Sequence, residues 1–402
     1  MPLGVYISVP FCRTKCSYCN FASDVFSKAG FERYVDRVCS EIANAPHAAE
    51  EMGGRFECEV DSIYLGGGTP TVLEAGQLER LFAAVRARFD VQVCAEVTVE
   101  CAPGTLAETV VESLLRCGVN RVSLGVQSFV NAEAAAVGRL HKRATVLEDI
   151  SQLRAAGISN INVDLIAGLP HQTASSWELS VAETLATGVP HVSVYMLEVD
   201  DDSRLGREVI AGGTRYHAHY VPEDEATADF YEVACERLNK AGISQYEISN
   251  FALAGSESRH NLKYWTRQPY FGFGMDAHSM LLSAGLESVR FSNPDSLERY
   301  IAAEAASRSD VSSVAALEES FFLGLRLNRG VDLMVLSARF GEGALSMARA
   351  AIAEFVEAGF LWRNSAVIGL TPRGRMVSNE VFEKFVGVGV ELNSNPALEG
   401  LI

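Results

Sequence analysis

With 402 residues, the chain is longer than one hydrophobic core usually supports, so we expect one large domain and one smaller domain. Its formal net charge of −17 disfavours broad nucleic-acid binding, because phosphate neutralisation needs a basic surface. No apolar run reaches the roughly 18 residues of a membrane-spanning helix, so we do not expect an integral membrane protein. Nine cysteines, of which only three are clustered, favour a reducing compartment, and we place the protein in the cytoplasm.

From residue 3 to about residue 200, short β-branched runs alternate with helical patterns. This alternation is typical of a parallel sheet wrapped by helices, and six such units predict an α/β fold with a barrel or partial (β/α) barrel. We expect strands near Leu3–Val9, Val60–Leu65, Ala95–Glu100, Arg121–Gly125, Ile161–Ile166 and Val192–Leu197. We expect the intervening helices near Glu32–Ala45, Ala75–Phe89, Leu106–Cys117, Ala144–Ala156 and Trp177–Thr187.

Three cysteines follow the first predicted strand at C-x3-C-x2-C spacing, namely Cys12, Cys16 and Cys19. Three thiolates on one tight loop can converge on a soft metal centre. A [4Fe–4S] cluster held by three cysteines keeps one iron free for an outside ligand. Structural zinc is a weaker alternative, because it needs four protein ligands and no fourth cysteine or histidine follows within the loop. A disulfide is weaker still, so the loop predicts an iron–sulfur cluster.

Nearly every predicted strand ends in a small or polar group, and in a barrel those ends share one face. The second strand leads into Gly66-Gly67-Gly68-Thr69-Pro70. This run either forms a plain tight turn or lets the backbone approach a ligand with free N–H groups. Any one of the polar residues can be a satisfied core group, but together with the cysteines they indicate a cavity for a polar small molecule. The polar groups at the later strand ends are Glu100, Gln127, Asp164 and Glu198.

Beyond residue 200 we expect a helix near Asp224–Ala241 and a tract rich in glycine and aromatic residues from Tyr264 to Gly285. The predicted organisation is a barrel domain over residues 1–300, a linker over 301–313, a C-terminal domain over 314–387 and a disordered tail over 388–402. Three helices followed by a two-stranded ribbon make the C-terminal domain resemble a winged helix. Because that domain is not strongly basic, we favour a protein-contact or lid role over DNA binding.

The cysteine loop with Tyr18, followed by the GGGTP run, resembles the radical S-adenosylmethionine (radical SAM) superfamily. The resemblance narrows to the oxygen-independent coproporphyrinogen III oxidase group, over roughly residues 3–385. It rests there on Tyr6, Glu100-Cys-Ala-Pro, Gly125-Val-Gln-Ser128, Asp164–Pro170 and the C-terminal helical domain. The resemblance implies that the free iron chelates the amine and carboxylate of S-adenosylmethionine. An electron from the cluster then cleaves the sulfonium and gives a 5′-deoxyadenosyl radical.

The resemblance also implies positions for the S-adenosylmethionine contacts. Tyr6 and Tyr18 are expected beside the cluster and the cofactor. The methionine amino group is expected against Gly67, Gly68 and Thr69. The ribose and the carboxylate are expected at Glu100, Gln127, Arg139 and Asp164, and the adenine between the backbone near Glu198 and His278.

Two features separate the chain from the decarboxylating oxidase. That enzyme has a fourth cysteine two positions after the third, where this chain has Phe21, and it has a long extension before the cluster, where this chain has eleven residues. The run His260-Asn261-Leu262-Lys263-Tyr264-Trp265 instead resembles the HNxxYW signature of the heme chaperone branch.

An imidazole can bind heme iron and the aromatic rings can cover the macrocycle, so His260, Asn261, Tyr264 and Trp265 are predicted heme contacts. The alternative is a structural histidine in an aromatic cluster. The loop residues His217 and His219 are either further candidate ligands or simply solvated side chains.

We therefore predict a heme chaperone that binds heme, a [4Fe–4S] cluster and S-adenosylmethionine. Heme-accepting respiratory proteins, some of them at the membrane surface, are its predicted partners, and we expect a monomer or homodimer. The first alternative is the oxidase that makes protoporphyrinogen IX from coproporphyrinogen III by radical decarboxylation. A third hypothesis, radical modification of RNA through the C-terminal domain, is disfavoured by the acidic charge.

Overall fold

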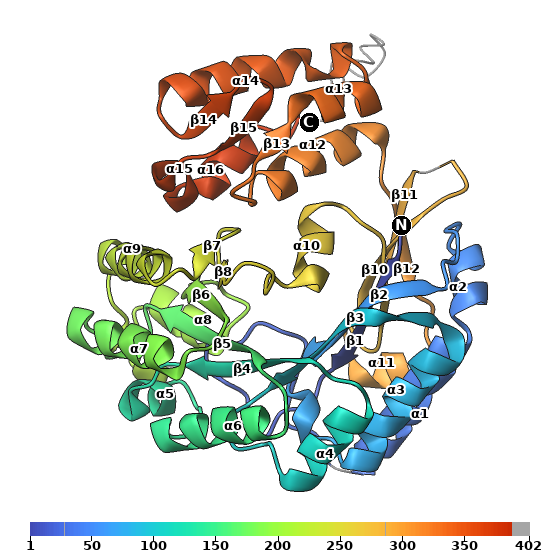
Figure 1. Ribbon diagram of the computed structural model, residues 1–402, viewed down its shortest axis with the longest axis vertical. Coiled ribbons are helices and arrows are strands. Elements are labelled where there is room, and N and C mark those ends of the chain that lie inside the picture. The colour runs from blue at the N-terminus through green and yellow to red at the C-terminus, as the bar shows by residue number, and fades with distance from the viewer. Residues whose placement is uncertain (28, 286, 388–402) are drawn as a thin grey trace.

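Six parallel strands form the centre of the protein in a computed structural model that describes residues 1–27, 29–285 and 287–387 (Figure 1). They pair in sequence order, and their bounds confirm all six predicted strands. The first strand, LGVYISV, is almost continuously buried, as expected for a parallel strand covered on both faces. The strands are β1 (Leu3–Val9), β2 (Glu59–Gly67), β3 (Asp90–Cys101), β4 (Arg121–Gln127), β5 (Asn160–Ala167) and β6 (His191–Met196).

Helices between these strands cover the outer face of the curved sheet, which confirms the partial barrel (Figure 1). The helix predicted to reach Ala45 ends at Ala43, because a second helix, with Pro46 in its first turn, begins at Ala45. The helices of this half are α1 (Ala29–Ala43), α2 (Ala45–Glu51), α3 (Ala75–Arg88), α4 (Glu108–Arg116), α5 (Asn131–Ala136), α6 (Arg143–Ala155) and α7 (Ala174–Thr187), with the 3-10 turn η1 (Pro70–Val72).

Both edges of the barrel sheet are extended by strands that the sequence patterns did not predict. On the β1 side, β9 (Tyr270–Phe273) pairs in parallel with β1, and β10 (His278–Leu282), β11 (Ser288–Ser292) and β12 (Ser307–Asp310) follow in antiparallel order. On the β6 side, the additions are β8 (Asn250–Ala252) and β7 (Ser244–Gln245). The second half also contains α8 (Arg204–Ile210), η2 (Arg215–Tyr220), α9 (Asp224–Lys240), α10 (Arg259–Trp265) and α11 (Leu297–Ile301).

The linker predicted over residues 301–313 is wrong for Ser307–Asp310, because these residues form the edge strand β12 and pair with β11. All four of its residues are exposed. A short, fully polar edge strand carries no apolar alternation, so its sequence resembles a loop.

The C-terminal domain has the predicted helices and ribbon around a hydrophobic core of its own. Its elements are α12 (Ser313–Gly324), β13 (Val331–Asp332), α13 (Leu333–Phe340), η3 (Gly343–Leu345), α14 (Ser346–Glu357), β14 (Leu361–Asn364), β15 (Val367–Leu370), α15 (Pro372–Met376) and α16 (Ser378–Glu383). Strand β13 was not predicted and makes the ribbon three-stranded. The predicted disordered tail lies outside the described residues.

A buried ion triad joins this domain to the barrel. Glu319 of α12 accepts from Arg267 Nε at 2.8 Å and from both terminal nitrogens of Arg290, on β11, at 2.5 and 2.9 Å. The side chain of Arg267 is 2% exposed and that of Glu319 is 9% exposed. The domain contact therefore contains charges that water does not solvate.

All nine cysteines are free thiols. Outside the cysteine loop, Cys101 and Cys117 are buried, whereas Cys58 and Cys94 are exposed. In the ranges that the structure describes, no helix combines the length and apolarity needed to cross a membrane.

Candidate functional site

The cysteine loop leaves the carboxyl end of β1 and is tied back on itself. Its two ends pair through the Cys12 N–H, which donates to Asp24 O at 3.0 Å, and the Asp24 N–H, which donates to Pro10 O at 2.9 Å. Lys15 Nζ braces the loop by donating to Phe21 O at 2.7 Å and to Ser23 O at 2.6 Å. These bonds hold the cysteines on one closed loop.

The thiols lie at the boundary between core and solvent. Cys16 is buried, whereas Cys12 and Cys19 are partly exposed. Burial raises the pKa of the Cys12 thiol, and the neighbouring Cys19 and Cys16 add to that rise. Among the described residues no three His, Cys, Asp or Glu side chains are placed to hold a single metal ion. A [4Fe–4S] cluster does not need three side chains around one metal ion, because each of its cysteines binds a different iron.

The glycine run packs directly against the start of the cysteine loop. Gly68 N–H donates to Val9 O and Thr69 N–H donates to Phe11 O, both at 2.8 Å. A Cβ on Gly68 would lie 2.7 Å from Phe11 O, so no other residue fits this contact. Gly67 N–H donates to Glu100 Oε2 at 3.1 Å. Of the two alternatives for this run, the one with free N–H groups does not hold for Gly67, Gly68 and Thr69, so an amino group would have to use the carbonyl oxygens of the run.

Glu100 and Asp164 lie on the inner face of the sheet as two half-buried acids. Glu100 accepts from Tyr64 Oη at 2.8 Å, and Asp164 accepts from Asn162 Nδ2 at 2.7 Å and Ser123 Oγ at 3.1 Å. Burial raises the pKa of Glu100 to about 7, with the Asp164 charge contributing. Burial also raises the pKa of Asp164. Near neutral pH, Glu100 can therefore either donate or accept a hydrogen bond.

The pKa of Glu100 predicts a specific dependence of stability on pH. Its ordinary value is 4.5, so between pH 4.5 and about 7 the folded protein keeps a proton that the unfolded chain releases. The free energy of unfolding therefore falls as pH rises through this window. We expect the cofactor-free Glu100→Gln variant to match the wild type near pH 4 and to exceed it at pH 8 by up to roughly 3 kcal/mol.

Denaturant unfolding of both proteins at pH 4 and pH 8 measures this difference. Glu59→Gln, at an exposed position of β2, serves as the matched control and should show no such change. A Glu100→Gln variant that is destabilised equally at both pH values would contradict the assignment.

Tyr18, Arg139 and Gln127 meet on the other side of the cysteine loop. Arg139 donates from a terminal nitrogen to Tyr18 Oη at 3.0 Å. Burial by itself lowers the pKa of Arg139, but the nearby Tyr18, Cys16 and Asp164 raise it overall. Gln127 adopts a left-handed backbone with φ 66°. Gln127 Oε1 and Arg139 Nε are buried without a hydrogen-bond partner among the described residues. A ligand with a carboxylate and a hydroxyl would satisfy both atoms, so these residues fit S-adenosylmethionine.

A cavity of about 310 Å³ lies between the cysteine loop and the sheet interior. It brings together Tyr6, Gly67 and His278, which were predicted to contact S-adenosylmethionine, with Tyr264 of the HNxxYW run. Its volume is at the lower end for a drug-sized ligand, and a porphyrin macrocycle needs more room. Glu198 is not among the residues that line this cavity and is exposed just beyond the end of β6.

The structure places His260 in the core with both ring nitrogens occupied. The side chain is 1% exposed, with Nδ1 at 3.0 Å from Ser62 Oγ and Nε2 at 2.9 Å from Tyr264 Oη. Burial lowers the pKa of His260 to about 3, and the Lys263 charge adds to that effect. In this conformation His260 therefore has no nitrogen free for heme iron. This agrees with the alternative that His260 is a structural histidine in an aromatic cluster.

Among the other HNxxYW residues, Trp265 contacts the C-terminal domain. The Arg326 guanidinium, just after α12, lies 4.5 Å from the centre of the Trp265 ring. Asn261 N–H lies 3.4 Å from Ser258 Oγ at the start of α10. The motif is thus built into a domain contact and touches the cavity only through Tyr264.

Polar residues inside the strands, which were not predicted, also belong to the inner face of the sheet. Tyr64, Arg121, Asn162, His191 and Ser193 lie on the inner face next to the predicted residues. Asn162 Nδ2 donates to Ser193 Oγ at 3.0 Å, and His191 Nδ1 lies 2.7 Å from Asn162 Oδ1. A usable signal existed for Asn162, which precedes Asp164 by two positions and so faces the same side of β5.

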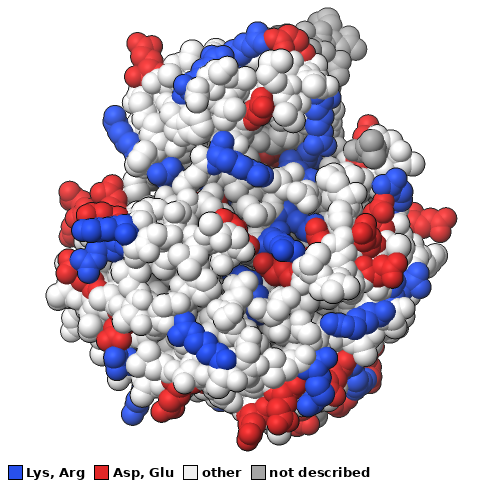
Figure 2. Space-filling view, viewed as in Figure 1, with Lys and Arg blue, Asp and Glu red and all other residues white. Residues whose placement is uncertain are grey.

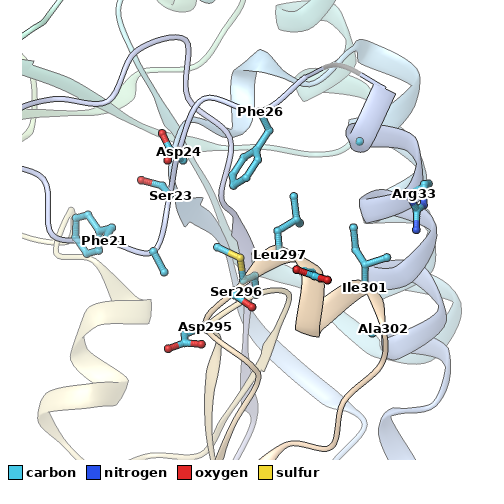
Figure 3. A pocket seen from close by; sticks show the side chains of 14 residues that line it. Phe21, Ser23, Asp24, Phe26, Arg33, Asp295, Ser296, Leu297, Ile301 and Ala302 are labelled. Atoms are coloured by element: carbon cyan, nitrogen blue, oxygen red, sulfur yellow. The ribbon is translucent and has the colours of Figure 1, made fainter.

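A larger groove of about 850 Å³ runs along the outer side of the cysteine loop (Figure 3). Phe26 and Leu297 point into it from opposite walls, and Arg33 lies at its edge. Three carboxylates, from Asp24, Asp295 and Glu298, line the same groove. Apart from Arg33, the charged groups that line the groove are acidic, which disfavours the two propionates of a heme there.

On the face shown in Figure 2, acidic and basic side chains are interspersed and the basic ones form no continuous patch. This distribution gives no support to a nucleic-acid interface on that face.

Comparisons with known proteins agree with this geometry. Residues 6–183 match the Radical SAM superfamily, and residues 311–377 match the HemN C-terminal domain. The solved structure of coproporphyrinogen III oxidase (HemN) from Escherichia coli, described as a radical SAM enzyme, superimposes with a TM-score of 0.81. That match has 22% identity and covers 96% of this chain and 90% of the other, which shows a shared fold. Membership of the radical SAM superfamily implies a [4Fe–4S] cluster and S-adenosylmethionine.

Curated relatives extend the match over nearly the full length. A protein named heme chaperone HemW from Lactococcus lactis is 34% identical over 96% of this chain and 97% of its own. Its namesakes from Bacillus subtilis and Escherichia coli are 32% and 29% identical, each over 96% of this chain and 99% and 98% of their own. By this similarity, and by the cysteine loop and strand-end residues assembled on one rim, the chain belongs to the heme chaperone HemW family of the radical SAM superfamily.

Proposed function

We propose that this chain is a heme chaperone, which binds heme, carries a [4Fe–4S] cluster with S-adenosylmethionine, and delivers the heme to another protein. The observation that carries the proposal is the nearly full-length similarity to proteins named heme chaperone HemW. Phe21, at the position where the oxidase group has a fourth cysteine, is consistent with it. The oxidase alternative has a structural neighbour at 22% identity in its favour, which is evidence about the fold alone.

The cluster ligands that we propose are Cys12, Cys16 and Cys19. When bound, the cluster supplies an electron and an open iron site for S-adenosylmethionine. The loop's hydrogen bonds to Asp24, together with the Lys15 brace, would keep the three thiols in place as the cofactor enters. Tyr18 would lie between the cluster and Arg139.

The remaining rim residues would orient S-adenosylmethionine. Arg139 and Gln127 have buried polar atoms available for its carboxylate and ribose. Glu100 and Asp164 would accept from hydroxyl or amino groups, and Tyr6, Gly67 and His278 would enclose the part that enters the inner cavity. The carbonyl oxygens of the Gly67–Thr69 run would accept from the methionine ammonium.

Replacing Arg139 by Met should weaken S-adenosylmethionine binding by about 10- to 100-fold, because a hydrogen bond to a charged group is lost. Cluster content should stay unchanged, since Arg139 is not a proposed ligand. Titration calorimetry on the reconstituted protein measures the affinity. Arg143→Met is the matched control, because Arg143 is nearby but exposed and paired with Glu183 at 2.8 Å. Equal affinities of both variants would exclude Arg139 from the site.

The recipients that we propose are heme-accepting respiratory enzymes, which would bring the chaperone to the membrane surface. We expect it to act as a monomer or homodimer.

Anaerobic reconstitution followed by two assays on one sample tests the function. We expect heme titration to give a Soret band at stoichiometric heme, and coproporphyrinogen III to remain unconverted in the presence of reductant and S-adenosylmethionine. Absence of a Soret band would overturn the chaperone proposal. Formation of protoporphyrinogen IX would favour the oxidase instead.

A further inference from the structure

A group of imidazole and phenol rings lies on the surface, separate from His260. We define the surface histidine cluster as His171, His217, His219 and Tyr220. His171 follows β5, and the other three belong to η2. All four side chains are exposed, Tyr220 by 50%. Unlike His260, these imidazoles are accessible to a large planar ligand from solvent.

Two of the imidazoles are hydrogen-bonded to each other, and one tautomer of the pair leaves His217 Nε2 free as a metal ligand. His171 Nε2 lies 3.0 Å from His217 Nδ1, so one of these nitrogens carries the shared proton. When His217 Nδ1–H donates to His171 Nε2, His217 Nε2 has a free lone pair. Iron-bound histidines commonly donate their second ring N–H to a neighbouring acceptor, which fixes the tautomer and the ring orientation. The pair can adopt this arrangement without moving either ring.

The same distance excludes the use of both histidines on one heme. Axial ligands lie on opposite faces of the macrocycle, whereas two nitrogens 3.0 Å apart lie on the same side of any metal they share. Only one of the pair can therefore bind heme iron, and the other acts as its hydrogen-bond partner.

Hydrogen bonds and a small hydrophobic core hold the loop that carries the surface histidine cluster in place. His171 N–H donates to Tyr220 O at 2.9 Å, and Ala218 is buried in a small core with Leu169 and Leu205. Leu205 N–H in turn donates to Ser17 O of the cysteine loop at 2.8 Å. Tyr216, His217 and His171 all adopt left-handed backbone, with φ 54°, 61° and 68°. Such conformations persist only where the surroundings fix them, so the rings are presented by an ordered loop.

Groups next to the surface histidine cluster can contact the macrocycle and a propionate of a heme. The ring of Tyr220 lies 4.1 Å from that of His171 and 4.0 Å from that of His219, which gives a continuous aromatic surface. Arg215, in the same turn, is exposed and has no ion-pair partner among the residues that the structure describes, so it is available to a propionate.

We propose that His217 binds heme iron through Nε2 while the protein carries heme. His171 is the positioning residue, because it holds the His217 ring through the hydrogen bond to Nδ1. This inference rests on the proposed function, since heme is the cargo that the function requires. An exposed ligand on the surface is suited to a cargo that must leave again, because the recipient can approach the heme directly. The buried His260 offers no such access.

Hemin titration of the full chain tests the assignment. We compare the wild type with His217→Asn, because asparagine tolerates the left-handed backbone. The matched control is His47→Ala, at an exposed histidine of α2. We expect His217→Asn to lose the Soret band of the ligated heme and to bind at least tenfold more weakly, with added imidazole restoring the band. His171→Phe should shift the band and weaken binding about tenfold, and His47→Ala should match the wild type.

The outcomes separate this inference from the proposed function. If the wild type binds heme and His217→Asn gives the same band and affinity, the inference is overturned and the function stands. Loss of the band in His260→Gln, together with an unchanged band in His217→Asn, would also overturn it. If the wild type itself binds no heme, the proposed function fails, and this inference fails with it.

Discussion

Replacing Cys16 by Ala should remove the iron–sulfur cluster and with it the capacity to bind S-adenosylmethionine through iron. With two thiolates remaining on the loop, one more iron loses its protein ligand, and a cluster held by three cysteines has no spare. We expect iron content to fall at least tenfold from about four per chain, and absorption near 400 nm to disappear. Iron analysis and ultraviolet–visible spectra after anaerobic reconstitution measure both quantities.

The chain supplies its own control for this experiment. Cys58 and Cys94 are exposed free thiols outside the loop. Their alanine variants remove a reactive thiol without touching the proposed ligands, so they should keep full iron content. Retention of a cluster in Cys16→Ala would refute the three-cysteine assignment, and its loss in Cys58→Ala or Cys94→Ala would indicate a different ligand set.

Glu319→Ala should destabilise the protein by about 3–5 kcal/mol, because it leaves two guanidinium groups without their shared carboxylate in a largely buried domain contact. Arg267 is the more affected partner, since its side chain is 2% exposed. Denaturant unfolding of the wild type and the variant measures the change. Limited proteolysis should also cut Glu319→Ala faster between the barrel and the C-terminal domain.

Glu79→Ala is the matched control for the triad. Glu79 pairs with Arg116 at 2.6 Å, but both side chains are more than two-fifths exposed, so water replaces the lost partner. We expect little change in its unfolding curve. A Glu319→Ala variant that behaves like Glu79→Ala would mean that solvent reaches the two arginines readily.

The HNxxYW run shows how a motif and its environment can point to different roles. The sequence resemblance predicts heme contacts at His260, Tyr264 and Trp265. The structure instead places His260 in a core network and Trp265 against Arg326 of the C-terminal domain. Loss of heme binding in a His260 variant would therefore not by itself prove iron ligation, because the same substitution removes a hydrogen bond to Tyr264, which lines the inner cavity.

Much of the barrel was predictable because its strands are buried on both faces. A run such as Leu3–Val9 must be apolar along its length, and this composition is visible without knowledge of its neighbours. The outer strands were missed for the opposite reason. Strand β12 is polar and exposed, and β13 has two residues, so their strand character comes from pairing with distant segments.

The sequence by itself determined the three-cysteine loop, the glycine run and the polar strand ends. Their residue types and spacing are local properties, and parallel strands bring their carboxyl ends to one rim. Only the tertiary structure decided which polar atoms are left unsatisfied there and which imidazoles solvent can reach. Gln127 and Arg139 retain buried atoms without partners, His260 has both nitrogens occupied, and His217 lies exposed beside His171. Availability for a ligand depends on contacts between residues far apart in the chain, and spacing along the sequence does not encode those contacts.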